Sequence, residues 1–176
     1  MKQILKTERL TLREMTPDDL PALAAILQDE PTMYAYEGAF SDEETRAWLN
    51  RQLDRYHSSG FGLWAVCLQE TGEMIGQAGV TLQSVEGEEL PEIGYLFNRA
   101  HWHRGYAAEA AIACKHYAFT VLGVAEIYSI IRDTNLASMN VAIRNGMTVR
   151  KRFIKHYRGV DMPHFLFGVK KSEPNP

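Results

Sequence analysis

Residues 92–97 read EIGYLF, and residues 102–107, which follow after a short loop, read WHRGYA. The first segment is apolar and aromatic like a strand, and the second opens an alanine-rich helix expected over residues 105–122. Amides at the start of a helix have no partner within it and lie at the positive end of its dipole. Because Gly105 lets the backbone approach a ligand closely, this turn is a candidate site for a diphosphate. The alternative is an ordinary helix start with a permissive glycine.

The segment after this helix indicates how the two halves join. Residues 127–131 (IYSII) form an unbroken β-branched, apolar run, as in a strand buried on both faces. A strand, a helix and a second strand in this order favour parallel pairing of residues 92–97 with this run. The helix between them carries mostly small residues near one face, which would allow close packing on a sheet. These residues are Ala107, Ala111, Cys114, Ala118 and Val121.

The remaining segments predict one mixed α/β layer structure. Thr16 and Pro17 are typical of a helix start, and the Ser41 to Glu44 segment matches a capping box for a helix that ends near Gly60. An acidic loop around Glu86, Glu88 and Glu89 is expected before residues 92–97. Further strands are expected within residues 8–14, 61–68, 74–82, 148–156 and 164–169, and a short helix over residues 135–146.

Length and composition limit the class of protein. The 176 residues suit a single domain over residues 1–171 with a flexible tail over residues 172–176. A net charge of -3 argues against a surface built as a whole for phosphate backbones. Cys67 and Cys114 are too few for a disulfide framework or a zinc ligand set. With no signal peptide and no apolar run of membrane length, we expect a cytoplasmic protein.

The chain resembles the GCN5-related N-acetyltransferases (GNAT), and within them the branch with the ribosomal-protein N-terminal alanine or serine acetyltransferases. The resemblance covers nearly all the chain and follows the order of its elements. It implies a GNAT-like fold, in which a mostly antiparallel sheet contains one splayed parallel strand pair and carries helices on both faces. It also implies that acetyl-CoA binds between residues 92–97 and 126–132. The segments that carry it are residues 7–13 (TERLTLR), 92–95 (EIGY), 102–107 (WHRGYA) and 135–147 (NLASMNVAIRNGM).

The resemblance also implies roles for individual residues. Main-chain groups of Leu96 and Phe97 would pair with the pantetheine arm, and Asn135 and Ser138 would lie beside the arm and the sulfur. The loop that begins at Trp102 would hold the pyrophosphate through the amides of His103, Arg104, Gly105, Tyr106 and Ala107. Two positions depart from the wider family: Trp102 replaces a frequent Gln or Arg, and Ala142 stands where many relatives carry a tyrosine acid.

Acetyl transfer from a thioester to an amine needs a neutral amine, a stabilised oxyanion and a proton for the departing sulfur. Glu92 is the candidate base, acting through a water, and its alternative is a strand-edge carboxylate paired with a cation. By analogy with the family, the Phe97 amide would bind the oxyanion. Ser138 is the candidate proton source. Its alternative is a bond to backbone amides in the first turn of its helix, and a thiolate can also leave without much help.

Other charged groups leave several interpretations open. His101 and His103 favour surface or phosphate contact over a metal site, so no metal is predicted. The acidic loop either attracts a cationic amine or is only solvated. A basic cluster near the C-terminus is the wet side of a strand, a site for the 3′-phosphate of CoA or an acidic substrate, or a nucleic-acid patch. Its members are Arg150, Lys151, Arg152, Lys155 and Arg158.

The sequence therefore predicts an acetyl-CoA-dependent N-acetyltransferase that acts on a primary amine by direct attack in a ternary complex. The acceptor is a protein N-terminus or a small amine such as a polyamine, amino sugar or amino acid. We expect no nucleic-acid or membrane partner, and a homodimer stays open because relatives often dimerise. The alternatives are a non-catalytic CoA-sensing module of the same fold and a nucleic-acid adaptor.

Overall fold

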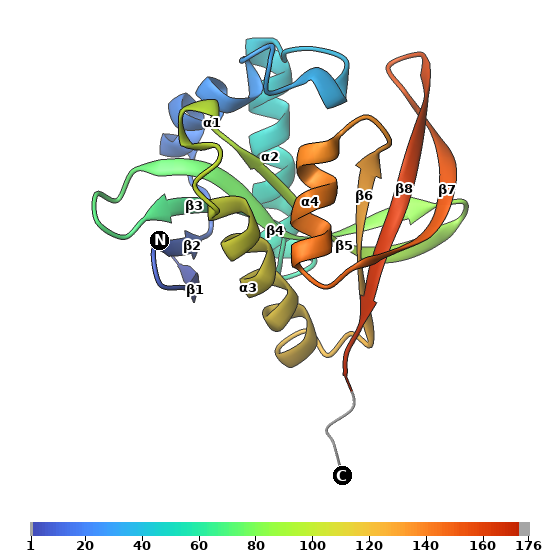
Figure 1. Cartoon of the computed structure of the whole chain (residues 1–176). Coiled ribbons are helices and arrows are strands. Elements are labelled where there is room, and N and C mark those ends of the chain that lie inside the picture. Colours follow the sequence, from blue (N-terminus) through green and yellow to red (C-terminus); the bar gives the residue numbers. More distant parts are fainter. Residues whose placement is uncertain (1, 173–176) are drawn as a thin grey trace.

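In the computed structural model, which describes residues 2–172, the strands form one sheet in the order β1-β2-β3-β4-β5-β6-β8-β7 (Figure 1). The strands are β1 (Gln3–Lys6), β2 (Leu10–Arg13), β3 (Leu63–Leu68), β4 (Met74–Val85), β5 (Glu88–Phe97), β6 (Glu126–Arg132), β7 (Thr148–Tyr157) and β8 (Val160–Lys170). The α-helices are α1 (Leu20–Leu27), α2 (Asp42–Ser58), α3 (Tyr106–Thr120) and α4 (Leu136–Arg144). Short 3₁₀ turns, η1 (Pro17–Asp19), η2 (Tyr34–Tyr36) and η3 (Arg99–His101), lie in the connections.

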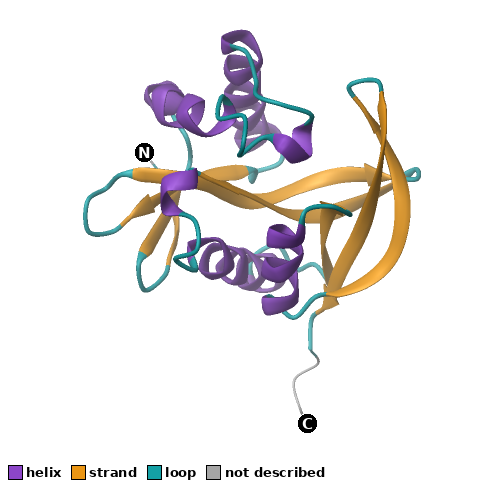
Figure 2. Ribbon diagram, turned by 45° about the horizontal axis from the view of Figure 1, so that its top comes forward, coloured by secondary structure: helices purple, strands orange, loops and turns teal. Residues whose placement is uncertain are grey.

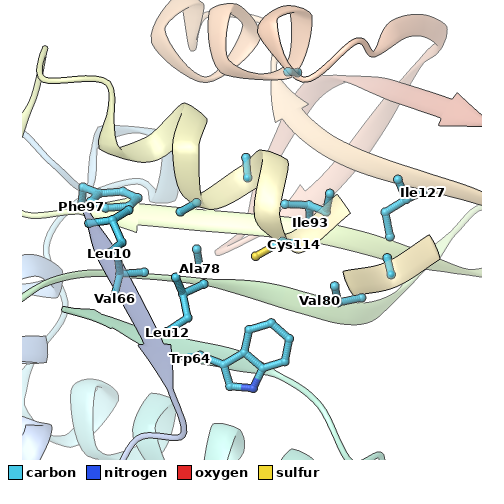
Figure 3. Close-up of a cluster of buried hydrophobic side chains, with 14 of the residues drawn as sticks. Leu10, Leu12, Trp64, Val66, Ala78, Val80, Ile93, Phe97, Cys114 and Ile127 are labelled. Carbon is cyan, nitrogen blue, oxygen red and sulfur yellow. The ribbon is translucent and has the colours of Figure 1, made fainter. Parts of the chain in front are cut away.

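The helices cover both faces of the sheet, as predicted. Helices α1 and α2 lie on one face and α3 and α4 on the other (Figure 2). The larger core fills the space between the sheet and α3, where the buried Cys114 lies near Ile93 (Figure 3). Small residues on α3 bring this helix close to the strands, although Val121, expected on the same face, is 64 % exposed. A second cluster, which includes Leu23, packs under α1 and α2.

The pairing of β5 with β6 is the feature that makes a site. It is the parallel pair in a sheet whose other neighbouring strands run antiparallel, and its register joins Glu92 to Tyr128 alone. Beyond that point the two strands separate, while β5 stays paired with β4 as far as Phe97. The predicted fold class, a mostly antiparallel sheet with one splayed parallel pair, is confirmed.

The structure corrects two predicted loops. The acidic stretch before residue 92 is part of a hairpin, because β4 continues to Val85 and β5 begins at Glu88. Glu86 and Gly87 form the turn, with φ of 51° and 88°. A glutamate rarely takes a positive φ, so the residue types give only a weak hairpin pattern. Arg158 and Gly159 make a similar turn between β7 and β8, so that β8 begins earlier than expected.

Two further features lie at the ends of the chain. Strand β1 was not predicted, and it pairs with β2 at the edge of the sheet. Most of the predicted tail, residues 173–176, lies outside the described residues.

None of the helices within residues 2–172 has the length and hydropathy needed to cross a bilayer.

Candidate active site between β5 and β6

A cleft of about 280 Å³ opens where β5 and β6 separate. Its walls come from both strands and from neighbouring elements that include α2, α4, β4, β7 and β8. Of the predicted site residues, Glu92, Leu96, Asn135 and Ser138 line this cleft. Phe97, Trp102 and residues 103–107 do not line it; they lie at the end of β5 and in the loop that leads into α3.

The hydrogen bonds of β5 show which of its peptide groups face the gap. The carbonyl of Ile93 accepts from Ser129 Oγ on β6 at 2.9 Å, and the carbonyl of Phe97 accepts from Trp102 Nε1 at 2.8 Å. The Asn98 amide instead donates to the Ile75 carbonyl at the start of β4 (2.9 Å). Peptide groups alternate in direction along an antiparallel ladder, so those of residues 93, 95 and 97 face the gap.

This alternation refines the two predicted strand contacts. The Phe97 amide faces the gap, where the oxyanion was expected, but the Phe97 carbonyl is already taken by Trp102. The main chain of Leu96 is directed toward β4, opposite Gln77, and Leu96 contributes its side chain to the cleft wall. Trp102, which stands where many relatives carry Gln or Arg, thus directs its indole N–H at the end of β5.

The loop before α3 presents a row of free amides. Helix α3 has no side-chain cap, and among the described residues the amides of residues 103–108 have no acceptor. His103 and Gly105 take left-handed conformations, with φ of 60° and 82°. Alternating backbone conformations of this kind turn successive N–H groups toward one point, which suits an anion.

Arg9 fastens this loop to the start of β2. Its guanidinium donates to the Arg104 carbonyl (Nη1 to O, 3.0 Å) and to Glu109 in the first turn of α3 (Nε to Oε2, 2.7 Å). It also lies over the Tyr106 ring, 4.5 Å from the centroid. Burial opposes ionisation of Glu109, but hydrogen bonds from Thr7 and Arg9 outweigh it and lower the pKa of this carboxyl. The segment 7–13 therefore fixes the loop that carries the free amides.

Glu92 lies at the vertex where the two strands part. Its carboxylate accepts from the Ile130 amide (Oε1, 3.3 Å) and from the Thr81 hydroxyl (Oε2, 3.3 Å). Burial raises the pKa of Glu92, although these hydrogen bonds and the charges of Lys155 and Arg55 act in the opposite direction. A carboxyl with a raised pKa at the base of a cleft is suited to proton transfer.

Asn135 and Ser138 adopt complementary roles at the start of α4. The Asn135 side chain caps the helix, because its Oδ1 accepts from the Ser138 amide at 3.1 Å. Within residues 2–172 the Ser138 hydroxyl has no hydrogen-bond partner, so it does not serve the first turn as the structural alternative required. Tyr95, which the sequence interpretation missed, donates its hydroxyl to the Ser138 carbonyl at 2.8 Å and joins β5 to α4.

The charged groups around the cleft differ from the expectation. Glu86, Glu88 and Glu89 do not line it, and Glu86 pairs with Lys151. His101 pairs with Glu73 (Nε2 to Oε1, 3.3 Å) and not with His103. Four of the five members of the C-terminal basic cluster are neutralised by carboxylates, whereas Lys155 lines the cleft. The four pairs are Arg150 with Glu126, Lys151 with Glu86, Arg152 with Asp133 and Arg158 with Glu44.

The cleft also contains basic residues that the sequence interpretation missed. Arg51 and Arg55 reach it from α2, and Arg132 and His164 reach it from β6 and β8. The four-residue spacing of Arg51 and Arg55 on α2 was a usable signal, because residues four apart share a helix face. However, the acidic and basic residues of α2 look alike in sequence, and only the fold shows which of them face the sheet.

Comparisons with known proteins agree with this geometry. A family profile described as an acetyltransferase (GNAT) domain matches residues 9–148. The protein YkkB of Bacillus subtilis (strain 168) is 37 % identical over 85 % of this chain and 90 % of its own length. The crystal structure of an acetyltransferase from Agrobacterium tumefaciens str. C58 is 30 % identical, with a TM-score of 0.80 over 97 % of this chain and 95 % of that one.

A more distant structure shares the fold. RimL, described as a ribosomal L7/L12 alpha-N-protein acetyltransferase in complex with coenzyme A, is 20 % identical, with a TM-score of 0.76 over 96 % of this chain and 98 % of that one. The profile match spans most of the chain and the YkkB match exceeds a third identity. The chain belongs to the GNAT acetyltransferase family.

Proposed function

We propose that this protein transfers the acetyl group of acetyl-CoA to a primary amine by direct attack. The observation that carries the proposal is the gap between β5 and β6, which has free amides beyond one end and a carboxyl with a raised pKa at its vertex. Membership of the GNAT family supports acetyl transfer, and the cleft supports a reaction in which donor and acceptor are bound together.

The residues present fit coenzyme A. The amides of residues 103–108 match a pyrophosphate, and a side chain at Gly105 would be strained at φ 82°. The free peptide groups of Tyr95 and the Phe97 amide match the amides of a pantetheine arm, which would extend the sheet as an added strand. Asn135 and Ser138 complete the opposite wall. When bound, this cofactor supplies an acetyl group activated as a thioester.

Glu92 is proposed as the base. An amine must lose a proton to react, and an α-amino group with a pKa near 8 is already partly neutral at pH 7. The Ile130 amide and the Thr81 hydroxyl hold the Glu92 carboxylate, so that it can take the proton directly or through a water. The Phe97 amide is proposed to donate to the acetyl oxygen, where negative charge develops.

The Ser138 hydroxyl is proposed to lie beside the sulfur and to donate its proton to the departing thiolate, after which solvent reprotonates Ser138 and takes up the proton that Glu92 removed from the amine. Because Asn135 provides the helix cap, this hydroxyl is free for that contact. The two cysteines are unsuited to carry the acetyl group. Both are buried, neither lines the cleft, and burial raises the pKa of each thiol.

Thiol release from acetyl-CoA with a panel of primary amines tests the proposal. We expect acetylation of at least one class of amine, with a loss of about a hundredfold in kcat for Glu92→Gln and a smaller loss for Ser138→Ala. Losses below about threefold in both variants would remove these two residues from the mechanism. Acid quench followed by intact-mass measurement should find no acetylated protein, and stable acetylation of Cys67 or Cys114 during turnover would contradict direct attack.

A further inference from the structure

The wall of the cleft carries more positive charge than the fold itself neutralises. The basic residues that line it are Arg51, Arg55, Arg132, Lys155 and His164, and Glu92 is the carboxylate among the lining residues. Arg132 is accounted for, because it pairs with Glu37 and donates to the Tyr34 carbonyl. Burial lowers the pKa of His164, which favours its neutral form. Arg51, Arg55 and Lys155 remain.

These three cations have no carboxylate partner. Within residues 2–172, no acidic oxygen lies within 4.0 Å of Arg51, Arg55 or Lys155. The side-chain hydrogen bond of Arg55 goes to a neutral amide, Gln52 Oε1, at 3.3 Å. Glu92 affects Arg55 and is affected by Lys155 only through longer-range charge. One carboxylate at that range does not compensate three cations.

The three cations border the cleft without a carboxylate between them, and Arg51 is exposed, with its guanidinium over the Trp48 ring, 5.4 Å from the centroid. Arg51 and Arg55 are one helical turn apart on α2, so their like charges share a face and repel. Arg55 is half-buried, and burial followed by the charge of Arg51 lowers its pKa. Lys155 enters the same cleft from β7. The cleft is thus bordered by cations on two different elements.

We infer that the acceptor carries a carboxylate near its amine, and that Arg51, Arg55 and Lys155 bind this carboxylate while the amine lies toward Glu92. The planar guanidinium groups suit a carboxylate, which they can hold through paired N–H donors. This inference rests on the proposed function and selects among its acceptors. Amino acids and peptides with an acidic residue near the N-terminus fit the cleft, whereas polyamines and amino sugars, which bring only positive charge, do not.

Matched acceptors test the inference. The first arm uses C-terminally amidated peptides that differ only in the side chain of the second residue. This residue is aspartate or asparagine in one pair of peptides and glutamate or glutamine in the other. A free amino acid series with the amine and carboxylate at increasing separation forms a second arm, which distinguishes small acids from peptides. For the wild-type protein we expect kcat/KM to be about tenfold higher for the acid than for its amide in at least one arm, mainly through KM. Raising the salt concentration should reduce this preference.

Variants on α2 identify the residues responsible. Arg55→Gln and Arg51→Gln should each remove most of the preference for the acid, because kcat/KM falls much more for the acid than for its neutral amide. Arg55→Lys keeps the positive charge and most of the aliphatic stem, so it should retain part of the preference for the acid. This variant replaces Arg55→Gln in the test if Arg55→Gln does not fold. Arg46→Gln is the matched control, because Arg46 is an exposed arginine of the same helix that does not line the cleft. It should leave the preference unchanged.

The outcomes separate the inference from the function on which it rests. Equal kcat/KM for acids and amides, or faster acetylation of a polyamine than of any acid, would overturn the inference and leave the acetyltransferase proposal intact. An unchanged preference in Arg51→Gln and in both Arg55 variants would also overturn it. If no amine of any class releases thiol from acetyl-CoA, both proposals fail.

Discussion

Two opposing requirements meet at the Glu92 side chain. As a base its carboxyl group must be ionised, but the buried position of this group disfavours the negative charge. Burial raises its pKa, so the folded protein holds this proton more tightly than the unfolded chain does. The contribution to stability is therefore fully present below the unfolded pKa and is lost as the pH rises through the folded pKa. Glu92→Gln cannot lose a proton and should not show this loss.

We predict that the unfolding free energy of Glu92→Gln, measured relative to wild type by urea titration, increases as the pH rises through that window and is level above it. Glu89→Gln is the control, since Glu89 is an exposed glutamate on the same strand. A difference between Glu92→Gln and wild type that stays constant with pH, or that falls as the pH rises, would contradict the assigned environment of Glu92.

Asp19 illustrates a residue whose role is structural. It receives both terminal nitrogens of Arg13, at 2.6 and 2.7 Å, and also the Thr16 amide at 2.8 Å, and it is only 7 % exposed. Burial opposes ionisation of Asp19, but the bonds from Arg13 and Thr16 outweigh it and lower its pKa. Replacing one partner would leave the other charge half-buried without compensation.

We predict that Asp19→Ala lowers the unfolding free energy by about 3 kcal/mol at neutral pH. This loss should shrink as the pH falls through the folded pKa of Asp19, because wild type then loses the ion pair as well. Urea unfolding at several pH values measures it, with the exposed neighbour Asp18→Ala as control. A loss below about 1 kcal/mol, or one equal to that of Asp18→Ala, would show that the pair adds little.

At the scale of elements, the N-terminus of α3 is the part of the structure on which cofactor binding depends. Gly105 holds a left-handed conformation next to the free amides, and Arg9 Nη2 lies 3.4 Å from the point where a Cβ would be placed. Gly123, just beyond the other end of α3, has a similar φ of 70° and no atom within 4 Å of its Cβ position. The two glycines therefore share the backbone strain but not the site.

Gly105→Ala and Gly123→Ala should each lower the unfolding free energy by about 1 kcal/mol, because alanine is strained at positive φ. Only Gly105→Ala should weaken acetyl-CoA binding, by about tenfold in Kd measured by calorimetry. Equal effects of the two substitutions on Kd would mean that strain, and not the geometry of the loop, controls binding.

The elements differ in how far the sequence reveals them. Helix α2 begins at Asp42 with Ser41 as its N-cap, and its start was predicted because a capping box is a local device that Ser41 and Glu44 form between themselves. Strand β6 was also predicted from its unbroken apolar run, but burial on both faces was not confirmed, because buried residues alternate with half-buried ones along it. The hairpin at Glu86 and Gly87 was missed because register and long-range pairing, and not the turn residues, hold a glutamate at positive φ.

The site shows the same division between local and long-range information. The resemblance pointed to Glu92 and to the loop before Gly105, where a short motif carries the chemistry. It did not reveal Arg51 and Arg55, because a basic residue on a polar helix is usually solvated and only the packing of α2 on the sheet turns these two toward the cleft. Nor did it reveal that Trp102 occupies the Phe97 carbonyl, a contact that depends on how the loop folds back.

At the scale of the whole molecule, one departure from regular pairing organises the rest. If β5 and β6 were paired along their length, the Ile130 amide would join a sheet ladder, whereas it donates to Glu92. The same separation exposes the gap-facing peptide groups of β5, and α2 on one face of the sheet and α4 on the other contribute walls to the cleft (Figure 2). We thus expect a ligand to complete the interrupted sheet.

Amide chemical shifts followed by NMR during titration with acetyl-CoA test this claim most directly, and a chain of 20.0 kDa is suited to the measurement. We predict that the largest changes fall on the amides of Tyr95, Phe97 and residues 103–107, with smaller changes on Asn135 and Ser138. A second hollow, lined in part by Glu88, Tyr128 and Lys170, should stay unaffected. Shifts confined to that hollow, or no shifts at saturating acetyl-CoA, would contradict the account.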